Sequence, residues 1–164
     1  MGQQDQSFES RIQRARLSLE GLSLGDAFGQ RSGPVVSKVL PSGPWTVSDD
    51  TMMAWSMLQV FETKESLDQN LLAAILAERY EDDSSRGYDK EMHRVLSEIS
   101  GGRNWEHVAS ESFHGRGSRG NGAAIRVAPL GAFYADDLDQ LILQAARSAV
   151  VTHTHPEAAH GAMV

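Results

Sequence analysis

The chain has 164 residues, of which 40% are hydrophobic and 23% are charged, and its formal net charge is −7. These values fit one soluble domain with a hydrophobic core, and the acidic balance argues against a general nucleic-acid or anionic-membrane binder. The sequence contains no cysteine, which excludes disulfides and thiolate metal sites. It shows no secretory signal and no apolar run that could span a bilayer, so we expect a cytoplasmic protein without membrane or nucleic-acid partners.

The N-terminal part predicts a long helix after a short flexible end. Residues 1–7 are polar, and residues 8–164 are expected to form the N-terminal part of a single all-α domain. Ile12, Ala15, Leu19 and Leu22 recur at helical spacing and define one face, on which Asp26 is the next position. A carboxylate in a core stripe needs a partner, because an unpaired buried charge is expensive.

Three glycines repeat every four residues along the same helix. Each glycine costs a helix about 1 kcal/mol relative to alanine. Gly21, Gly25 and Gly29 therefore predict that another backbone or a ligand approaches this side of the helix closely. Residues 30–44, with three prolines and two glycines, are expected to form a loop.

The stretch Ser48-Asp49-Asp50-Thr51 precedes an almost wholly apolar run that ends at Phe61, and this run predicts a buried helix over 49–62. Two interpretations of its acidic start are open. Ser48 can be an N-cap whose neighbouring acids complement the helix dipole. Alternatively, the hydroxyls and carboxylates are hard oxygen ligands that suit Mg²⁺ or Mn²⁺.

The remaining chain also predicts helices. We expect them over 66–81, with Leu67, Leu71, Ala74 and Ile75 on one face, over 89–100 and over 104–113. A buried helix over 123–134 should be bent or split by Pro129. Arg126 is the polar exception in this helix and should be paired. A last face is predicted from Ile142, Ala146 and Ala149 within a helix over 138–153. No strand alternation is found, so the predicted fold class is all-α.

The segment 114–122, His-Gly-Arg-Gly-Ser-Arg-Gly-Asn-Gly, has the composition of an anion site. Four glycines free the backbone to turn its N–H groups toward a ligand, two arginines add positive charge, and a helix is expected to start directly after them. A flexible surface loop is the alternative. The spacing fits neither a Walker loop nor a dinucleotide-binding fingerprint.

The segment 152–156, Thr-His-Thr-His-Pro, places two imidazoles and two hydroxyls at a helix end. His153 continues the predicted face of the preceding helix, where a lone histidine is usually a satisfied core residue, but the clustering favours a ligand-facing role. The apolar, small-residue run over 158–164 has the character of a helix cut after its first turns. We therefore expect a chain truncated at its C-terminus, whose exposed apolar surface favours self-association.

Four of these segments together, over 21–29, 48–52, 120–131 and 152–156, resemble the ADP-ribosylglycohydrolase family, whose well-known bacterial members resemble dinitrogenase reductase-activating glycohydrolase. The motifs come in the family's order. The resemblance implies an all-α fold, with a binuclear Mg²⁺ or Mn²⁺ centre in a cleft. It also implies hydrolysis of the glycosidic bond between ADP-ribose and a protein side chain or small acceptor.

The resemblance also assigns site residues. Ser48, Asp49 and Asp50 match the first metal-ligand motif, and Asp49 and Asp50 are the expected catalytic residues, with Asp50 the candidate base. Asp26 matches a structural acid of the first helix. The other matches are substrate-binding residues, of which the loop residues cradle the diphosphate and the histidines border the cleft: Gly117, Ser118, Arg119, Gly120, Asn121, His153 and His155.

The sequence departs from the family's pattern in two places. No acid stands at 30–34, where members often carry a glutamate, and the family's last metal-ligand motif would lie beyond residue 164. The expected metal site is therefore incomplete and weak. This leaves two functional hypotheses, a metal-dependent hydrolase of ADP-ribosyl bonds and a non-catalytic protein on the same scaffold, either ADP-ribose-binding or structural.

Overall fold

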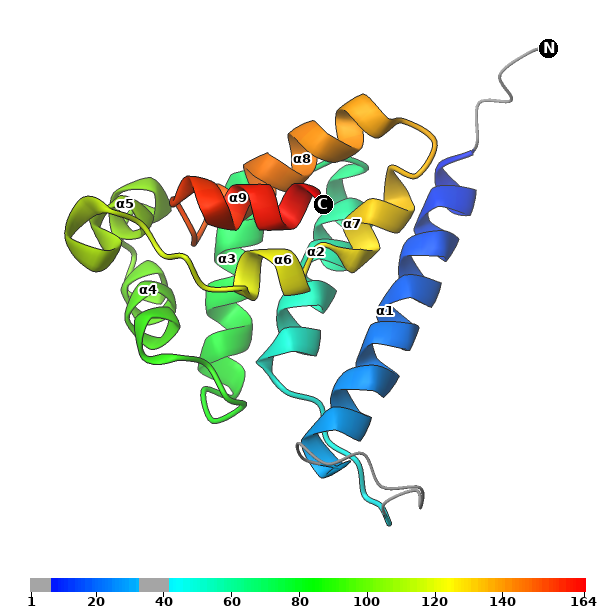
Figure 1. The fold of residues 1–164 in the computed structure, drawn as a ribbon, viewed down its shortest axis with the longest axis horizontal. Coiled ribbons are helices and arrows are strands. Elements are labelled where there is room, and N and C mark those ends of the chain that lie inside the picture. The colour runs from blue at the N-terminus through cyan, green and yellow to red at the C-terminus, as the bar shows by residue number, and fades with distance from the viewer. Residues whose placement is uncertain (1–6, 33–41) are drawn as a thin grey trace.

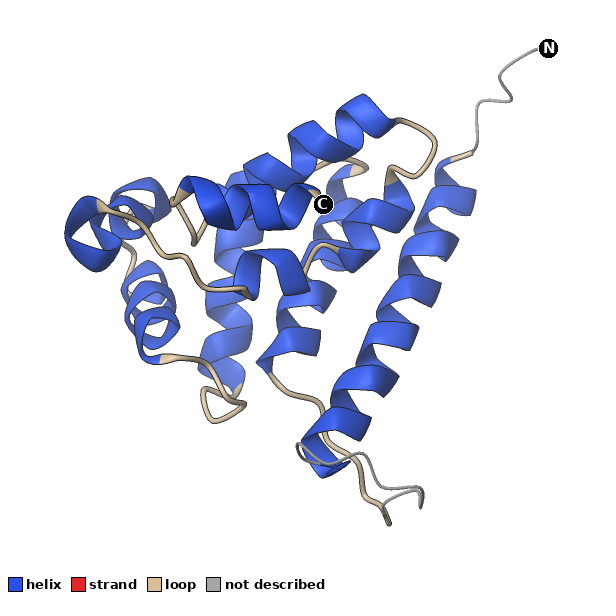
Figure 2. Cartoon of the chain, viewed as in Figure 1, coloured by secondary structure: helices blue, strands red, loops and turns tan. Residues whose placement is uncertain are grey.

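The computed structural model describes residues 7–32 and 42–164, and every regular element in these ranges is a helix (Figure 1, Figure 2). The predicted all-α class is thereby confirmed. In chain order the helices are α1 (Phe8–Ser32), α2 (Asp49–Lys64), α3 (Gln69–Asp82), α4 (Lys90–Ser100), α5 (Trp105–Gly115), α6 (Gly122–Ile125), α7 (Ala128–Phe133), α8 (Leu138–Val150) and α9 (Pro156–Met163).

Polar side chains start most of these helices. Asp68, Asp89, Asn104 and Asp137 each accept hydrogen bonds from backbone N–H groups in the first turn of the helix that follows. These caps satisfy N–H groups that have no partner within the helix. They explain why the expected helices over 66–81, 89–100 and 104–113 begin close to where the sequence places them.

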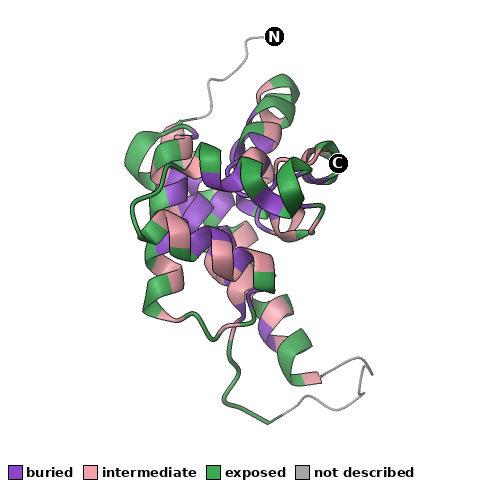
Figure 3. Cartoon of the chain, turned by 90° about the vertical axis from the view of Figure 1, so that its left-hand side faces the viewer, coloured by how far each residue is buried: buried purple, intermediate pink, exposed green. Residues whose placement is uncertain are grey.

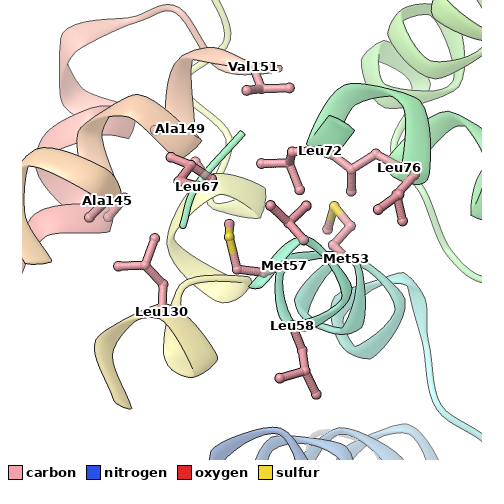
Figure 4. Packing of buried hydrophobic residues seen from close by; sticks show 14 of the residues in the cluster. Met53, Met57, Leu58, Leu67, Leu72, Leu76, Leu130, Ala145, Ala149 and Val151 are labelled. Atoms are coloured by element: carbon pink, nitrogen blue, oxygen red, sulfur yellow. The ribbon is translucent and has the colours of Figure 1, made fainter. Parts of the chain in front are cut away.

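The core is built around α2, which carries buried residues on most of its circumference. Figure 1 shows α1 and α7 on one side of α2 and α3 on the other, with α8 and α9 crossing the upper part. Met57 of α2 and Leu130 of α7 lie in the middle of the cluster, while Leu58 points toward α1 (Figure 4). Phe61 stacks on Phe133, with ring centroids 4.3 Å apart. Helix α2 is thus the buried helix that the sequence predicts.

Burial is concentrated where these helices face one another, and their outer turns are exposed (Figure 3). The helix expected over 123–134 is divided into α6 and α7, and Pro129 lies in the first turn of α7. Proline lacks the N–H that a continuous helix would need, so the predicted split is confirmed. None of the helices in the described ranges combines the length and apolarity needed to cross a bilayer.

Two predicted helix faces are right only in part: Leu67 and Ile75 of the first face and Ala149 of the second are buried as predicted, but other members are not. In α8 the buried side chains include Gln144, Ala145 and Ser148, whereas Ile142 is 40% exposed. In α3 the buried face contains Leu72, while Ala74 is exposed. Ser148 can be buried because its hydroxyl donates to the carbonyl of Ala145. A face predicted from apolar residues alone leaves out buried polar residues whose hydrogen bonds are made.

The glycine repeat on α1 does not mark close packing within the described chain. A Cβ atom built on Gly21, Gly25 or Gly29 would meet no heavy atom within 4 Å among the described residues. The expected approach of another backbone is therefore not made there. Of the loop expected over 30–44, α1 includes the residues up to Ser32, residues 42–47 form a loop, and residues 33–41 lie outside the described part. Residues 1–6 of the expected flexible end also lie outside it.

Candidate functional site

The acidic start of α2 is held in place by Asp26 of α1. Oδ2 of Asp26 accepts from the backbone N–H of Ser48 at 2.8 Å and from the hydroxyl of Thr51 at 2.6 Å, while its Oδ1 accepts from the Ser48 hydroxyl at 2.7 Å. Asp26 is therefore the partnered structural acid that the sequence predicts. It fixes the direction in which α2 begins.

Ser48 is the N-cap of α2. Its backbone is extended, its side chain is 4% exposed, and its Oγ accepts from the N–H of Asp50 at 3.2 Å. The capping interpretation is therefore confirmed. The hydroxyl donates its proton to Asp26 and uses one of its two lone pairs to accept from Asp50, so one lone pair remains, and its role as a metal ligand stays a prediction.

Asp49 and Asp50 are half-buried and form no salt bridge with any cation of the described residues. Burial, followed by the neighbouring charge of Asp50, raises the pKa of Asp49 to about 6, and the charges of Asp26 and Asp89 add to this effect. Burial and the Asp26 charge also raise the pKa of Asp50. Among the described residues, no basic side chain forms an ion pair with either carboxylate.

These two carboxylates have the chemistry of ligands for a hard divalent cation, because Mg²⁺ and Mn²⁺ prefer oxygen donors and would offset their repulsion. The fit is partial. Within residues 7–32 and 42–164, no group of three or more histidine, cysteine, aspartate or glutamate side chains converges as a metal site would require. The role of Asp49 and Asp50 as metal ligands therefore stays a prediction.

The glycine-rich loop begins where α5 leaves helical geometry. Phe113 and His114 have φ of 51° and 60°, and Gly115 and Gly117 have φ of 81° and 78°. A Cβ atom on Gly117 would lie 2.4 Å from the backbone nitrogen of His155. Glycine is therefore required at this position both by backbone conformation and by space. The loop is packed tightly against the segment that follows α8.

Within the loop, Ser118 is buried and its hydroxyl accepts from the N–H of Gly120 at 3.1 Å. Arg119 is exposed, and its Nε donates to Nε2 of His155 at 3.1 Å. Asn121 is exposed at the start of α6, but its side chain makes no capping hydrogen bond. The helix after the loop is thus only four residues long, shorter than the sequence suggests.

The two histidines of 152–156 occupy different environments. His153 is 1% exposed, and its ring lies beneath Gly120 and Gly122, where a Cβ atom would come within 3.1 Å of the imidazole. Burial and the Arg126 charge lower the pKa of His153 to about 4, so the ring is neutral at pH 7. His155 instead starts α9, where its Nδ1 accepts from the N–H of Glu157 at 3.1 Å.

A cavity of about 510 Å³ lies on the loop. It brings together four of the residues that the sequence selects for substrate binding: Gly117, Arg119, Gly120 and His155. It also includes Phe113, Arg116 and Pro156. The sequence analysis does not select Phe113, because an apolar residue at the end of a predicted helix is expected to be buried in the core. In the structure Phe113 is 48% exposed. Its signal is its place directly before the glycine-rich segment.

The loop and the acidic start of α2 are neighbours in space. The methyl group of Met53, one turn beyond Asp49, lies 3.6 Å from the position of a Cβ on Gly122. The charge of Asp89 acts on both Asp49 and His153. The end of the glycine-rich segment at Gly122 thus lies against α2, one turn beyond the carboxylate pair.

Comparison with known proteins agrees with this architecture. The family model described as ADP-ribosylglycohydrolase matches residues 7–164. The chain is 35% identical over 123 residues to ADP-ribosylhydrolase ARH3 of Xenopus tropicalis, covering 73% of this chain and 34% of that protein. It is 33% identical over 120 residues to ADP-ribosylhydrolase ARH3 of Homo sapiens, covering 71% and 32%. The chain spans about a third of the length of these relatives. It belongs to the ADP-ribosylglycohydrolase family.

Proposed function

We propose that this chain contributes to a metal-dependent hydrolase that removes ADP-ribose from a protein side chain or a small acceptor. The observation that carries the proposal is the pair Asp49 and Asp50, two half-buried carboxylates that no cation of the described residues neutralises. The similarity to ADP-ribosylhydrolases supports the nature of the substrate.

In this proposal the two carboxylates would hold Mg²⁺ or Mn²⁺. A divalent cation supplies Lewis acidity and lowers the pKa of a bound water. The overall reaction adds water across the glycosidic bond: the water oxygen bonds to the anomeric carbon, the bond from that carbon to the acceptor breaks, and a proton passes to the acceptor. Asp50 is our candidate for the base that takes the water's proton.

The glycine-rich loop would bind the ADP-ribose diphosphate. The N–H groups of Gly117 and Gly120 already donate to the Ser112 carbonyl and the Ser118 hydroxyl. The remaining N–H groups of the loop, together with the Arg119 guanidinium, would therefore bind the phosphate oxygens. Holding the diphosphate there would position the ribose toward the acids of α2, and such positioning accelerates a reaction by removing the need to orient the reactants. Asp26 contributes by fixing the start of α2 rather than by contacting substrate.

The experiment measures release of free ADP-ribose from a mono-ADP-ribosylated peptide in the presence of Mg²⁺ or Mn²⁺. We expect release by the native chain and none above background from the double variant Asp49→Asn with Asp50→Asn. Glu106→Gln, an exposed charge change on α5, is the matched control and should act like the native chain. Equal release from the double variant would overturn the assignment. Metal-independent binding of ADP-ribose without release would instead support a non-catalytic binding protein.

A further inference from the structure

The loop over 83–89, which connects α3 to α4, lies beside the start of α2 (Figure 1). The backbone N–H of Asp49 donates to the carbonyl of Arg86 at 3.1 Å. In return, Nη1 of Arg86 donates to the carbonyl of Val47 at 3.0 Å. One residue of the loop therefore holds the backbone on both sides of the N-cap of α2, through one backbone and one side-chain hydrogen bond.

The guanidinium of Arg86 is itself held in place. Its Nε lies 3.2 Å from Oδ2 of Asp83, and the two side chains form an ion pair. Oδ1 of Asp83 accepts from the N–H of Ser85 at 3.1 Å and from its hydroxyl at 2.6 Å. Hydrogen bonds to an ionised carboxylate are stronger than those between neutral groups. They order the turn from which Arg86 reaches the backbone before α2.

The other end of the loop is anchored in the core. Tyr88 is 6% exposed, and its ring packs edge-on against Tyr80 of α3 and His93 of α4, with centroids 5.3 and 6.2 Å apart. Asp89, the next residue, accepts from two N–H groups in the first turn of α4. Since both ends of the loop are fixed in this way, its middle residues are presented to α2 from a rigid support.

Gly87 lies directly against the carboxylate of Asp49. Its φ is 111°, and a Cβ atom built on it would lie 3.1 Å from Oδ1 of Asp49. Both the backbone conformation and the available space therefore favour glycine at this position. Gly102, after the end of α4, also has a positive φ of 89°, but a Cβ on it would meet no heavy atom within 4 Å among the described residues. The two glycines thus differ in their contact with a carboxylate and not in the sign of φ.

We propose that Arg86 and Gly87 are positioning residues for the carboxylate of Asp49. Arg86 fixes the backbone that carries Asp49, and Gly87 leaves the space beside its Oδ1. Asp26 holds the same segment from the side of α1, so the start of α2 is clamped between two elements. The proposal rests on the proposed function only where it gives this carboxylate a part in binding a metal ion.

The first test measures the χ1 rotamer of Asp49 in metal-free buffer at pH 7.5. Three-bond couplings from the side-chain carboxyl carbon to the backbone nitrogen and carbonyl carbon report it in protein labelled with carbon-13 and nitrogen-15. We expect one rotamer in the native chain and changed or averaged couplings in Gly87→Ala. Gly102→Ala, which shares the strain of a positive φ, should keep the native values. Averaged couplings in the native chain, or native couplings in Gly87→Ala, would overturn the proposal for Gly87.

The second test measures hydrogen exchange of the Asp49 amide, which donates to Arg86. We expect about tenfold faster exchange in Arg86→Met, which keeps an apolar stem but has no donor for Val47, while amides in the middle of α2 keep their native protection. Arg103→Met, which removes ion pairs between α4 and α5, is the matched control and should stay within about twofold of native. Native protection of Asp49 in Arg86→Met would contradict the clamp. If Gly87→Ala does not fold, this result and the native rotamer decide.

The third test connects positioning to the metal. In calorimetric titrations with Mn²⁺ we expect Gly87→Ala to bind about tenfold more weakly than Gly102→Ala, because residues that orient a metal ligand affect affinity by about this factor. Equal affinity of the two variants would refute a part for Gly87 in metal binding. No uptake by the native chain would remove the proposed metal centre, whereas the couplings and the exchange rates decide the positioning by themselves.

Discussion

At the scale of single residues, Asp26 stabilises the fold, whereas the charges of the neighbouring Asp49 and Asp50 destabilise it. Asp26 accepts three hydrogen bonds from the start of α2. Asp49 and Asp50, in the first turn of α2, carry charges that burial and neighbouring carboxylates disfavour. A carboxylate that accepts several hydrogen bonds stabilises a fold. A carboxylate whose pKa is raised by burial and like charges is a candidate for a functional role.

We expect Asp26→Asn to destabilise the protein by roughly 2 kcal/mol. The amide loses the negative charge and one of the two acceptor oxygens that bind Ser48 and Thr51. Urea unfolding at pH 7.5, followed by circular dichroism, measures the change. An unfolding midpoint equal to that of the native chain would show that these hydrogen bonds contribute nothing net.

Asp49→Asn should have the opposite effect at pH 7.5, with a gain of about 1 kcal/mol after allowance for solvent screening at a half-buried site. The pKa of Asp49 is about 6 in the folded chain and 3.8 in the reference state, so its ionisation disfavours folding above pH 6. The penalty fades as the pH falls from 6 to 4, because the native carboxyl becomes protonated first. The gain should therefore vanish near pH 4.

Thermal unfolding in metal-free buffer at pH 7.5 and pH 4 measures this difference, with the exposed change Glu81→Gln as control. A gain that persists at pH 4 would attribute the effect to packing and not to charge. At this scale the sequence predicts features that depend on the residue's own helix face and chemical type. A carboxylate on a core stripe predicts that Asp26 has a partner. The raised pKa of Asp49 comes first from burial, which depends on how the helices pack around the start of α2.

At the scale of elements, the sequence predicts the helices well because their starts carry local signals. The capping residues Asp68, Asp89 and Asn104 can be recognised in the sequence because aspartate and asparagine are preferred at helix N-caps. The buried faces of α3 and α8 are predicted less well. In α8, Gln144 and Ser148 are buried while they donate to Gln140 and Ala145 of the same helix, and a face drawn from apolar residues alone leaves them out. The glycines of α1 and of the loop look alike in sequence, yet only those of the loop are crowded.

That difference predicts opposite results for two glycine substitutions. Gly117→Ala should destabilise the chain by about 2 kcal/mol or more, because φ is 78° and the new Cβ would lie 2.4 Å from the His155 nitrogen. Gly25→Ala, in an open helical position on α1, should stabilise by about 0.5–1 kcal/mol. Denaturant unfolding of both variants checks this. Equal effects of the two substitutions would contradict the tight loop packing.

At the scale of the whole molecule, the site is assembled from segments about 70 residues apart. The glycine-rich segment lies against α2 because α6 packs on α2, where Met53 faces Gly122. Motifs in a fixed order predict which segments take part, whereas the placement of His153 below the loop and the cavity boundary at Phe113 follow from the packing of α5, α6 and α9. Such packing cannot be read from one sequence.

The most direct test of the account is calorimetric titration of Mg²⁺ and Mn²⁺ into this chain, with ADP-ribose absent and present. We predict metal uptake that ADP-ribose strengthens about tenfold, because ligand and metal would share one site. The uptake should be lost when Asp49 and Asp50 are both replaced by asparagine. A folded sample that takes up no metal in either condition, or equal uptake by the double variant, would contradict a metal centre at the start of α2.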